Sequence, residues 1–296
     1  MSLHKLIEQQ SNRFETALDR AIQNLLNLVN KWQDELFENL SNDLILAFST
    51  EGGNILAITE NLQIAASLKD VFDTYIQNRV LKDGVLVSQD ILDLTNKVQD
   101  YFTAIGFDTN KTDAFFKDAL TFLRERLGID ENGKILRGGA LYDVFQSEAV
   151  VQKLKNTAIQ AVVNGVSLKA YRNELKAIAT NENGELMKYY KQISFDYFNQ
   201  ASEIVNSRVA EGLGLEYFIY QGSLKTTSRA FCIKRANKVF SIKEAQLWKN
   251  DKDLIVRDRV NYNSLLQRGG YNCRHFIKYI SKDMAKVLEP SKFLNE

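Results

Sequence analysis

LHKLIEQQSNRFETALDRAIQNLLNLVNKWQDELFENL, residues 3–40, decides the fold class of this chain. Apolar side chains recur in it at three- and four-residue steps, the spacing that places side chains on one face of an α-helix. The pattern can continue to about Phe48, where STEGGN (49–54) supplies a stop. A periodic run longer than about 25 residues is typical of a coiled-coil-like arm or a bundle helix. Because the heptads are imperfect, we favour a bundle helix or an assembly contact.

The helical pattern continues after this stretch. We expect further helices over residues 54–80, 88–105, 112–127, 141–163 and 185–213, and another that starts behind Ser167. Thr112 and Ser167 are predicted N-caps, and GIDENGKILRGG (128–139) has the composition of a turn or short hairpin. The only proline is Pro290, which permits long uninterrupted helices in the earlier chain without proving them. The prediction is a mainly α protein with an elongated helical N-terminal region.

The pattern changes after Gly214. LEYFIYQG and RHFIKYI have the β-rich character of strands, and SIKEAQLW reads as one short capped helix. We therefore divide the chain into a long-helix bundle or arm for assembly contacts (1–214) and a small α+β C-terminal module (215–296). Residues 216–296 carry 16 Lys+Arg and 8 Asp+Glu, a net +8, whereas the rest of the chain carries −7. The module could face phosphate or an acidic partner, or it could present an ordinary solvated basic surface.

Composition and absent motifs exclude several classes of function. At 296 residues, 45% hydrophobic and 25% charged, the chain is typical of a soluble protein with a core. It shows no long apolar run and no signal peptide, so we expect no membrane association and synthesis in a reducing cytoplasm. There is no GxxxxGK[ST], GxGxxG, HExxH or GxSxG motif. We predict a protein that is not an enzyme and uses no cofactor.

GGYNCRH (269–275) concentrates residue types that are scarce here, because the chain has only two cysteines and two histidines. In an extended segment Cys273 and His275 share a face, where Cys232 could join them around a soft cation. That set supplies three ligands rather than four, and His4 lies at the far end of the sequence. A Cys232–Cys273 disulfide is a second reading. Buried structural cysteines are the default, so we predict no metal.

Two further readings concern the basic residues of the module. His275 could act as a general acid or base beside Arg229 or Arg274, as in an effector-type nuclease. Alternatively, a basic face could contact the backbone of DNA without reading its sequence. The candidates for that contact are Lys225, Arg229, Lys234, Arg235 and Lys238.

Together, YQGSLKTTSRAFCIKRANKVFSIKEAQLW (220–248) and GGYNCRHF (269–276) resemble the C-terminal module of the phage Mu F-like minor head proteins, also called phage head morphogenesis proteins. The match covers about a fifth of the chain. Asn237 replaces the usual turn glycine, which is tolerable because asparagine also visits left-handed backbone. Leu224 and Lys225 stand where members often have Pro and Asp, and His275 replaces a second cysteine. The residues that match are Tyr220, Gly222, Thr227, Arg229, Cys232, Lys238, Val239, Phe240, Gly269, Gly270, Asn272, Cys273, Arg274 and His275.

The resemblance implies a minor structural and assembly protein of a tailed-phage head, associated with the portal vertex or the head interior. Its expected partners are portal and/or capsid proteins, in an oligomeric assembly, with packaged double-stranded DNA as a further contact. Its expected location is the virion head, after assembly in the host cytoplasm. GGYNCRH would then turn the chain into the last strand of the module and bring Cys273 to the region of Cys232.

Overall fold

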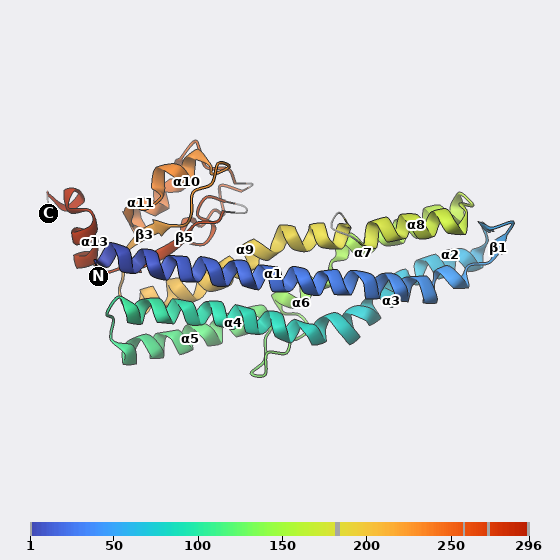
Figure 1. Ribbon diagram of the computed structural model, residues 1–296, viewed down its shortest axis with the longest axis horizontal. Coiled ribbons are helices and arrows are strands. Elements are labelled where there is room, and N and C mark those ends of the chain that lie inside the picture. The colour runs from blue at the N-terminus through green and yellow to red at the C-terminus, as the bar shows by residue number, and fades with distance from the viewer. Residues whose placement is uncertain (1, 181–183, 257, 271–272, 295–296) are drawn as a thin grey trace. The chain divides into compact units, whose positions relative to one another are not determined.

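The structure is a computed structural model that describes residues 2–180, 184–256, 258–270 and 273–294. It is mainly helical, which confirms the predicted fold class (Figure 1). The first helix, α1, spans Leu3–Asp43, 41 residues. It ends before Phe48 because a short 3-10 turn, η1 (Ile45–Ala47), follows it.

The chain forms two compact units that are interleaved in sequence. Unit 1 comprises residues 1–22, 89–125 and 194–296, and unit 2 comprises residues 23–88 and 126–193. The helices α1, α4 (Leu81–Ala104) and α9 (Glu185–Gly212) contribute residues to both. The sequence boundary at residue 214 therefore falls inside unit 1. The segment after residue 214 belongs to this unit because it packs against the earlier helices. The Tyr101 hydroxyl of α4 donates to the Tyr279 carbonyl at 2.8 Å, and the Phe14 and Phe276 rings lie 5.2 Å apart.

Unit 2 is built around α7 (Glu148–Val163), which packs against α2 (Thr59–Ala66), α3 (Leu68–Tyr75) and α8 (Leu168–Ala179). Besides parts of α1, α4 and α9, it contains η1, β1 (Thr50–Glu51), β2 (Asn54–Ile55), η2 (Ile76–Val80) and α6 (Ala140–Gln146). The short β1–β2 hairpin joins the loop between α7 and α8, where the Ile55 amide donates to the Val166 carbonyl at 3.0 Å. Trp32 packs edge-on against Phe145 and Tyr190, with ring centroids 5.8 and 6.0 Å away.

Several predicted helix boundaries in the first 214 residues are wrong. The segment expected to be helical from residue 54 starts as strand β2, and its helix begins at Thr59. α4 runs through Gly84, across the predicted gap between residues 80 and 88, and a Cβ at Gly84 would lie 2.4 Å from the Ile135 side chain. Ser147, with φ +47°, divides the predicted 141–163 helix into α6 and α7.

The two predicted N-caps have different outcomes. The Ser167 hydroxyl accepts from the Ala170 amide at 3.2 Å, which confirms it as the cap of α8. Thr112 lies inside α5 (Thr109–Leu127), where its hydroxyl donates to the Asp108 carbonyl at 2.7 Å. Asp108 takes the capping position instead, since its carboxylate accepts from the Asn110 amide at 2.9 Å.

Unit 1 contains a three-stranded antiparallel sheet in the order β4-β3-β5. Its strands are β3 (Tyr217–Gln221), β4 (Val239–Ser241) and β5 (Phe276–Ile280), and its short helices are α10 (Ala230–Arg235), α11 (Ile242–Gln246), η3 (Leu247–Asn250), α12 (Ser264–Gln267), α13 (Lys282–Leu288) and η4 (Pro290–Phe293). In the register Phe218 faces Phe240 on β4 and Tyr279 on β5. Trp248 packs edge-on against Phe218 and Phe240, at 5.8 and 5.1 Å between ring centroids. These elements form the α+β region expected after residue 214.

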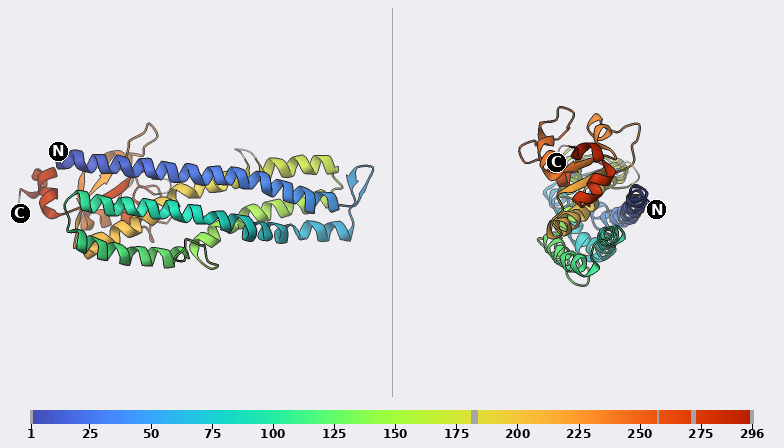
Figure 2. Two further views of the ribbon diagram at one scale, coloured as in Figure 1. Left: turned by 60° about the horizontal axis from the view of Figure 1, so that its bottom comes forward. Right: turned by 90° about the vertical axis from the view of Figure 1, so that its left-hand side faces the viewer.

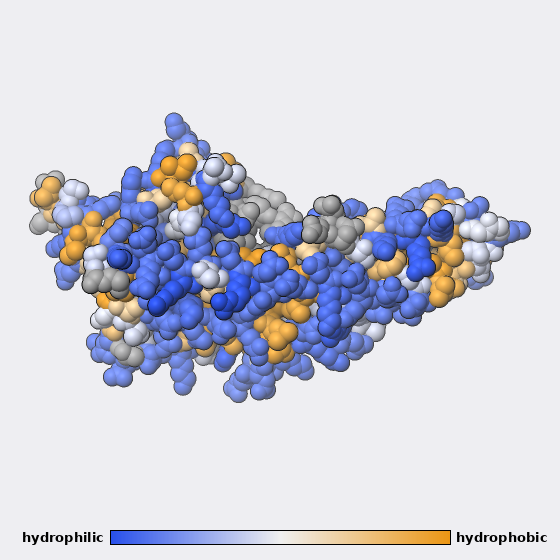
Figure 3. Space-filling model, in the orientation of Figure 1, coloured by the Kyte–Doolittle hydropathy of each residue, from blue (hydrophilic) through white to orange (hydrophobic). Residues whose placement is uncertain are grey.

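The helices of unit 1 flank this sheet. α4 and α5 run side by side in both Figure 1 and Figure 2, and Gln99 Nε2 donates to Asp113 Oδ1 at 2.6 Å between them. Among the helices formed by described residues, none has the length and apolar character needed to cross a membrane. The face drawn in Figure 3 is mostly hydrophilic, and its apolar side chains form separate patches.

Candidate functional site

Residues from three separate segments of the predicted motif meet in unit 1. Tyr220 comes from β3, Cys232 from α10, and Cys273 and His275 from the segment that leads into β5. β5 begins at Phe276, so Cys273 and His275 precede the strand expected from RHFIKYI. The predicted approach of Cys273 to Cys232 is confirmed, since their Sγ atoms lie 3.8 Å apart.

The four side chains form one compact cluster. The Tyr220 hydroxyl lies 3.5 Å from Cys232 Sγ and 3.4 Å from Cys273 Sγ, and Cys273 Sγ lies 3.9 Å from His275 Nδ1. The rings of Tyr220 and His275 stack with centroids 5.0 Å apart. Each cysteine and the histidine is only 3% exposed, and both thiols are free. The cluster is therefore a buried donor set of two thiols, one imidazole and one phenol.

Two glycines of the motif allow the backbone to approach this cluster closely, and a third fits against a neighbouring loop. A Cβ on Gly269 would lie 2.6 Å from Cys232 Sγ and 2.9 Å from Cys273 Sγ. Gly222, with φ +133°, would place one 2.9 Å from the His275 Cα. Gly270, with φ +86°, packs on the Ile255 carbonyl. Glycine is therefore required in the Gly269-Gly270 loop for two reasons: a side chain would clash with neighbouring atoms, and the turn needs a positive φ.

Replacing Gly269 with alanine is expected to lower the free energy of unfolding of unit 1 by about 1–3 kcal/mol, because the new methyl group overpacks the cluster. Urea denaturation followed by Trp248 fluorescence in a Trp32→Phe background measures this. In a Cys232→Ala background the same change should cost less, since one of the two clashing sulfurs is gone. An equal cost in both backgrounds would show that contact with Cys232 is not the cause.

The two thiols differ in their electrostatics. The Cys232 thiol donates toward Cys273 and holds the pKa of Cys273 well below its usual value, with His275, Arg268 and Tyr220 adding to the effect against burial. The same hydrogen bond, together with burial, raises the pKa of Cys232. Burial also raises the pKa of Tyr220, so its hydroxyl remains a donor. The cluster favours a negative charge on Cys273.

A buried polar network that joins α9 to β5 and to Arg268 was missed by sequence reasoning. Glu203 Oε1 on α9 accepts from the Ile277 amide at 3.0 Å and lies 3.5 Å from the guanidinium of Arg268. Asn206 Nδ2 donates to Glu203 Oε2 at 3.0 Å and to the Ile277 carbonyl at 2.8 Å. Polar residues three apart on a long helix resemble any solvated face in sequence. Only packing against β5 shows that this pair is internal.

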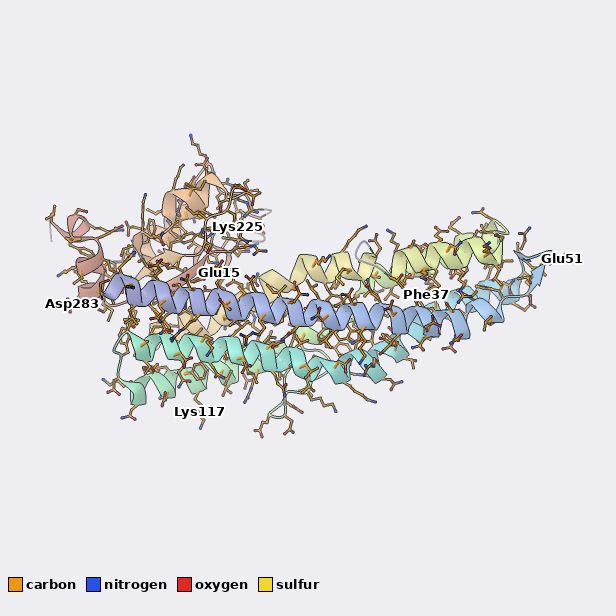
Figure 4. The ribbon with its side chains drawn as sticks, viewed as in Figure 1. Glu15, Phe37, Glu51, Lys117, Lys225 and Asp283 are labelled. Atoms are coloured by element: carbon orange, nitrogen blue, oxygen red, sulfur yellow. The ribbon has the colours of Figure 1, made fainter. Side chains whose placement is uncertain are left out.

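A hollow of about 260 Å³ opens beside the cluster. Cys232, Cys273 and His275 contribute to its wall, and the other lining residues are Ser223, Lys225, Thr227, Ser228, Arg229 and Arg274. Figure 4 shows the loop that carries Lys225 above the N-terminal part of α1, near Glu15, whose carboxylate accepts from the Ser223 hydroxyl at 2.8 Å. Arg229 Nη1 donates to the Gly269 carbonyl at 2.9 Å, and Arg274 lies 3.7 Å from Asp19. Positive charge and hydroxyl groups therefore border the buried donors.

The residues predicted to contact DNA do not form one uniform set. Lys225 and Lys238 are exposed. Lys234 forms an ion pair with Asp253. For Arg235 the prediction is wrong. This residue is buried, lies 2.6 Å from the Asp251 carboxylate and stacks over Phe231, so its charge is paired inside the module and does not face DNA.

Two further motif residues contribute to the turn and to the packing of the module. Asn237 adopts φ +60°, as expected of a residue that replaces a turn glycine. Phe240 packs on Trp248 within the sheet. Asn272 lies outside the described residues.

Comparison with known proteins adds no relative to this picture. No protein-family model, no curated protein and no solved structure matches the chain. The chemistry open to the cluster therefore follows from its own donors, whose four measured separations run from 3.4 to 3.9 Å. Such a set can hold a soft cation, close a disulfide, or act as a packed polar core.

Proposed function

We propose that this chain is a minor structural and assembly protein of a tailed-phage head, associated with the portal vertex or the head interior. The observation that carries the proposal is that motif residues from three segments, which bear the resemblance to the Mu F-like proteins, meet in one place: Tyr220, then Arg229 and Cys232, then Gly269 and Cys273. Residues that are far apart in sequence and share only chance similarity need not meet in space. Their meeting supports reading them as one module.

The long helices support an assembly role by their form. A 41-residue helix and a 28-residue helix provide extended surfaces for contacts with portal proteins, capsid proteins or further copies of the chain. The motif residues themselves have packing roles: Gly269 fits against the sulfurs, and Arg229 fixes the carbonyl of Gly269. A module whose marked residues serve packing suits a structural protein.

Mass spectrometry of phage particles from the host that encodes this chain tests the proposal. We expect the chain at low copy relative to portal protein, and we expect cross-links from α1 or α9 to portal or capsid proteins. Host outer-membrane proteins that co-purify serve as the control for contamination. Absence of the chain from particles and from head-assembly intermediates would contradict the proposal.

Contact with packaged double-stranded DNA is the second part of the proposal, and exposed Lys225 and Lys238 support it. Each phosphate contact contributes about −0.9 to the slope of log affinity against log salt concentration. Replacing either lysine with alanine should make the slope shallower by about that amount. Lys117→Ala, which removes an exposed charge from α5, should leave it unchanged (Figure 4). Binding to DNA without salt dependence would contradict a backbone contact.

An effector-type nuclease is the alternative, and the hollow favours it because His275, Arg229 and Arg274 share its wall. The position of His275 weighs against it: the imidazole is 3% exposed and stacks on Tyr220, whereas a general base must reach its proton. A nuclease assay with the intact chain and with His275→Ala separates the two. Cleavage of DNA or RNA by the intact chain that His275→Ala abolishes would favour the nuclease. If neither protein cleaves, the nuclease alternative is excluded.

A further inference from the structure

We propose that Cys232, Cys273 and His275 bind a divalent zinc-type cation. The proposal departs from the sequence-based expectation of structural cysteines, and it holds whether or not the chain is a phage protein. Two thiolates and an imidazole are ligands that Zn²⁺ prefers. One Sγ from each cysteine and one ring nitrogen of the histidine all lie within 4.8 Å of one another.

The distance between the two sulfurs fits a shared metal ion better than a disulfide bond. Two sulfurs about 2.3 Å from one tetrahedral zinc ion are about 3.8 Å apart. The Sγ atoms of Cys232 and Cys273 are 3.8 Å apart. A disulfide would require about 2.05 Å and therefore a movement of both side chains. His275 needs only a small approach, since its Nδ1 is 3.9 Å from Cys273 Sγ.

The imidazole of His275 supplies an independent observation. Its Nε2 is buried and has no hydrogen-bond partner among the described residues, and Nδ1 makes only a long contact of 3.9 Å with Cys273 Sγ. Buried polar atoms in folded proteins are nearly always paired, and an exception calls for a water or an ion. Neither ring nitrogen has a close partner among the described residues, so one of them is available to a cation that the two sulfurs share.

The backbone around the sulfurs is arranged to support negative charge. The Gly269 amide donates to Cys273 Sγ at 3.3 Å, and Arg229 holds the carbonyl of the same residue. Hydrogen bonds of this kind orient metal ligands and tune their basicity. Binding displaces the thiol protons to solvent, so two thiolates balance the charge of the ion.

The fourth ligand of a tetrahedral ion would come from the hollow, because Cys232, Cys273 and His275 all contribute to its wall. None of the residues that line it contributes a carboxylate, whereas Lys225, Arg229 and Arg274 contribute positive charge. A water molecule or a small anion is therefore the ligand that fits there. This leaves the site with three protein ligands and one exchangeable position.

Metal content and Co²⁺ spectroscopy of the intact chain test the proposal. We expect about one zinc per chain after purification under reducing conditions. Co²⁺ added to chain that has been stripped of metal should give thiolate charge-transfer absorption and the visible bands of tetrahedral cobalt. Zn²⁺ should then bleach these bands. A chain that purifies without metal and gives no cobalt bands while both thiols remain reduced overturns the proposal, as does a Cys232–Cys273 disulfide that forms without any zinc binding.

Substitutions then identify the ligands. Cys232→Ser, Cys273→Ser and His275→Gln should each weaken Zn²⁺ binding by more than about 100-fold, since even supporting residues of metal sites contribute 10–100-fold. His4→Gln removes the other histidine of the chain, which is exposed, and should change nothing. If a ligand variant fails to fold, the cobalt spectrum of the unaltered chain still decides. Full zinc retention in folded His275→Gln would exclude His275 as a ligand and overturn the three-ligand site.

Discussion

Replacing Glu203 with alanine is expected to lower the free energy of unfolding of unit 1 by about 3–5 kcal/mol, the usual cost of breaking a buried ion pair by removing one partner. The side chains of Glu203 and Arg268 are 4% and 3% exposed. Without the carboxylate, the Arg268 guanidinium stays buried with no counter-charge, and the Ile277 amide loses its acceptor. Because Ile277 belongs to β5, the loss would loosen the strand that follows the Cys and His cluster.

Urea denaturation in a Trp32→Phe background measures this, because Trp248 then becomes the only tryptophan and reports on unit 1. Glu211→Ala on the same helix is the control, since an exposed carboxylate is expected to matter by no more than about 0.5 kcal/mol. A loss below about 1 kcal/mol for Glu203→Ala would mean that the network does not anchor β5 to α9.

Replacing Lys278 with methionine is expected to stabilise unit 1 at neutral pH by about 1–3 kcal/mol. Lys278 is buried, and its Nζ lies 4.6 Å from the centre of the Tyr101 ring and 4.8 Å from that of Phe14. Burial lowers its pKa to about 8, although Glu203 acts in the opposite direction. The difference from an exposed lysine corresponds to about 3 kcal/mol. Loss of the cation–π contacts offsets part of the gain.

The effect of Lys278 should depend on pH in a defined window. Between about pH 8 and the ordinary lysine pKa of 10.5 the unfolded chain holds a proton that the folded chain has released. Folding stability due to this residue therefore rises with pH across that window, and the destabilising effect is complete below it. The advantage of Lys278→Met should be constant up to about pH 8 and shrink above it. Tyr101, whose pKa burial raises, is present in both proteins, so its titration cancels in the difference.

Urea denaturation of the two proteins at several pH values between 7 and about 9.5 gives this difference. Lys286→Met on α13 replaces an exposed lysine and should show no comparable gain or pH dependence. If Lys278→Met lowers stability at pH 7, the cation–π contacts outweigh the cost of burying the charge, and the expectation is wrong.

The helical architecture was predictable because it depends on local periodicity. The apolar residues of α1 that were identified at three- and four-residue steps, such as Phe14, Leu18 and Trp32, are buried in the structure. The cap at Ser167 and the end of α9 close to Gly214 also follow from short-range chemistry. Boundaries failed where local preference did not decide, as at Gly84, which lies inside α4 in a place where an added Cβ would clash with the Ile135 side chain.

The sequence was sufficient to predict which residues form the candidate site, but not which buried groups surround it. Scarcity and spacing alone selected Cys232, Cys273 and His275 from 296 residues. Nothing local identified Glu203, which accepts from the Ile277 amide of β5, or Lys278, which lies against aromatic rings from other elements. The sequence by itself determined which segments are helical and which residues carry unusual chemistry, since both follow from neighbours along the chain. Only the tertiary structure decided that these donors meet and which charges are buried, because burial depends on packing between segments far apart in sequence.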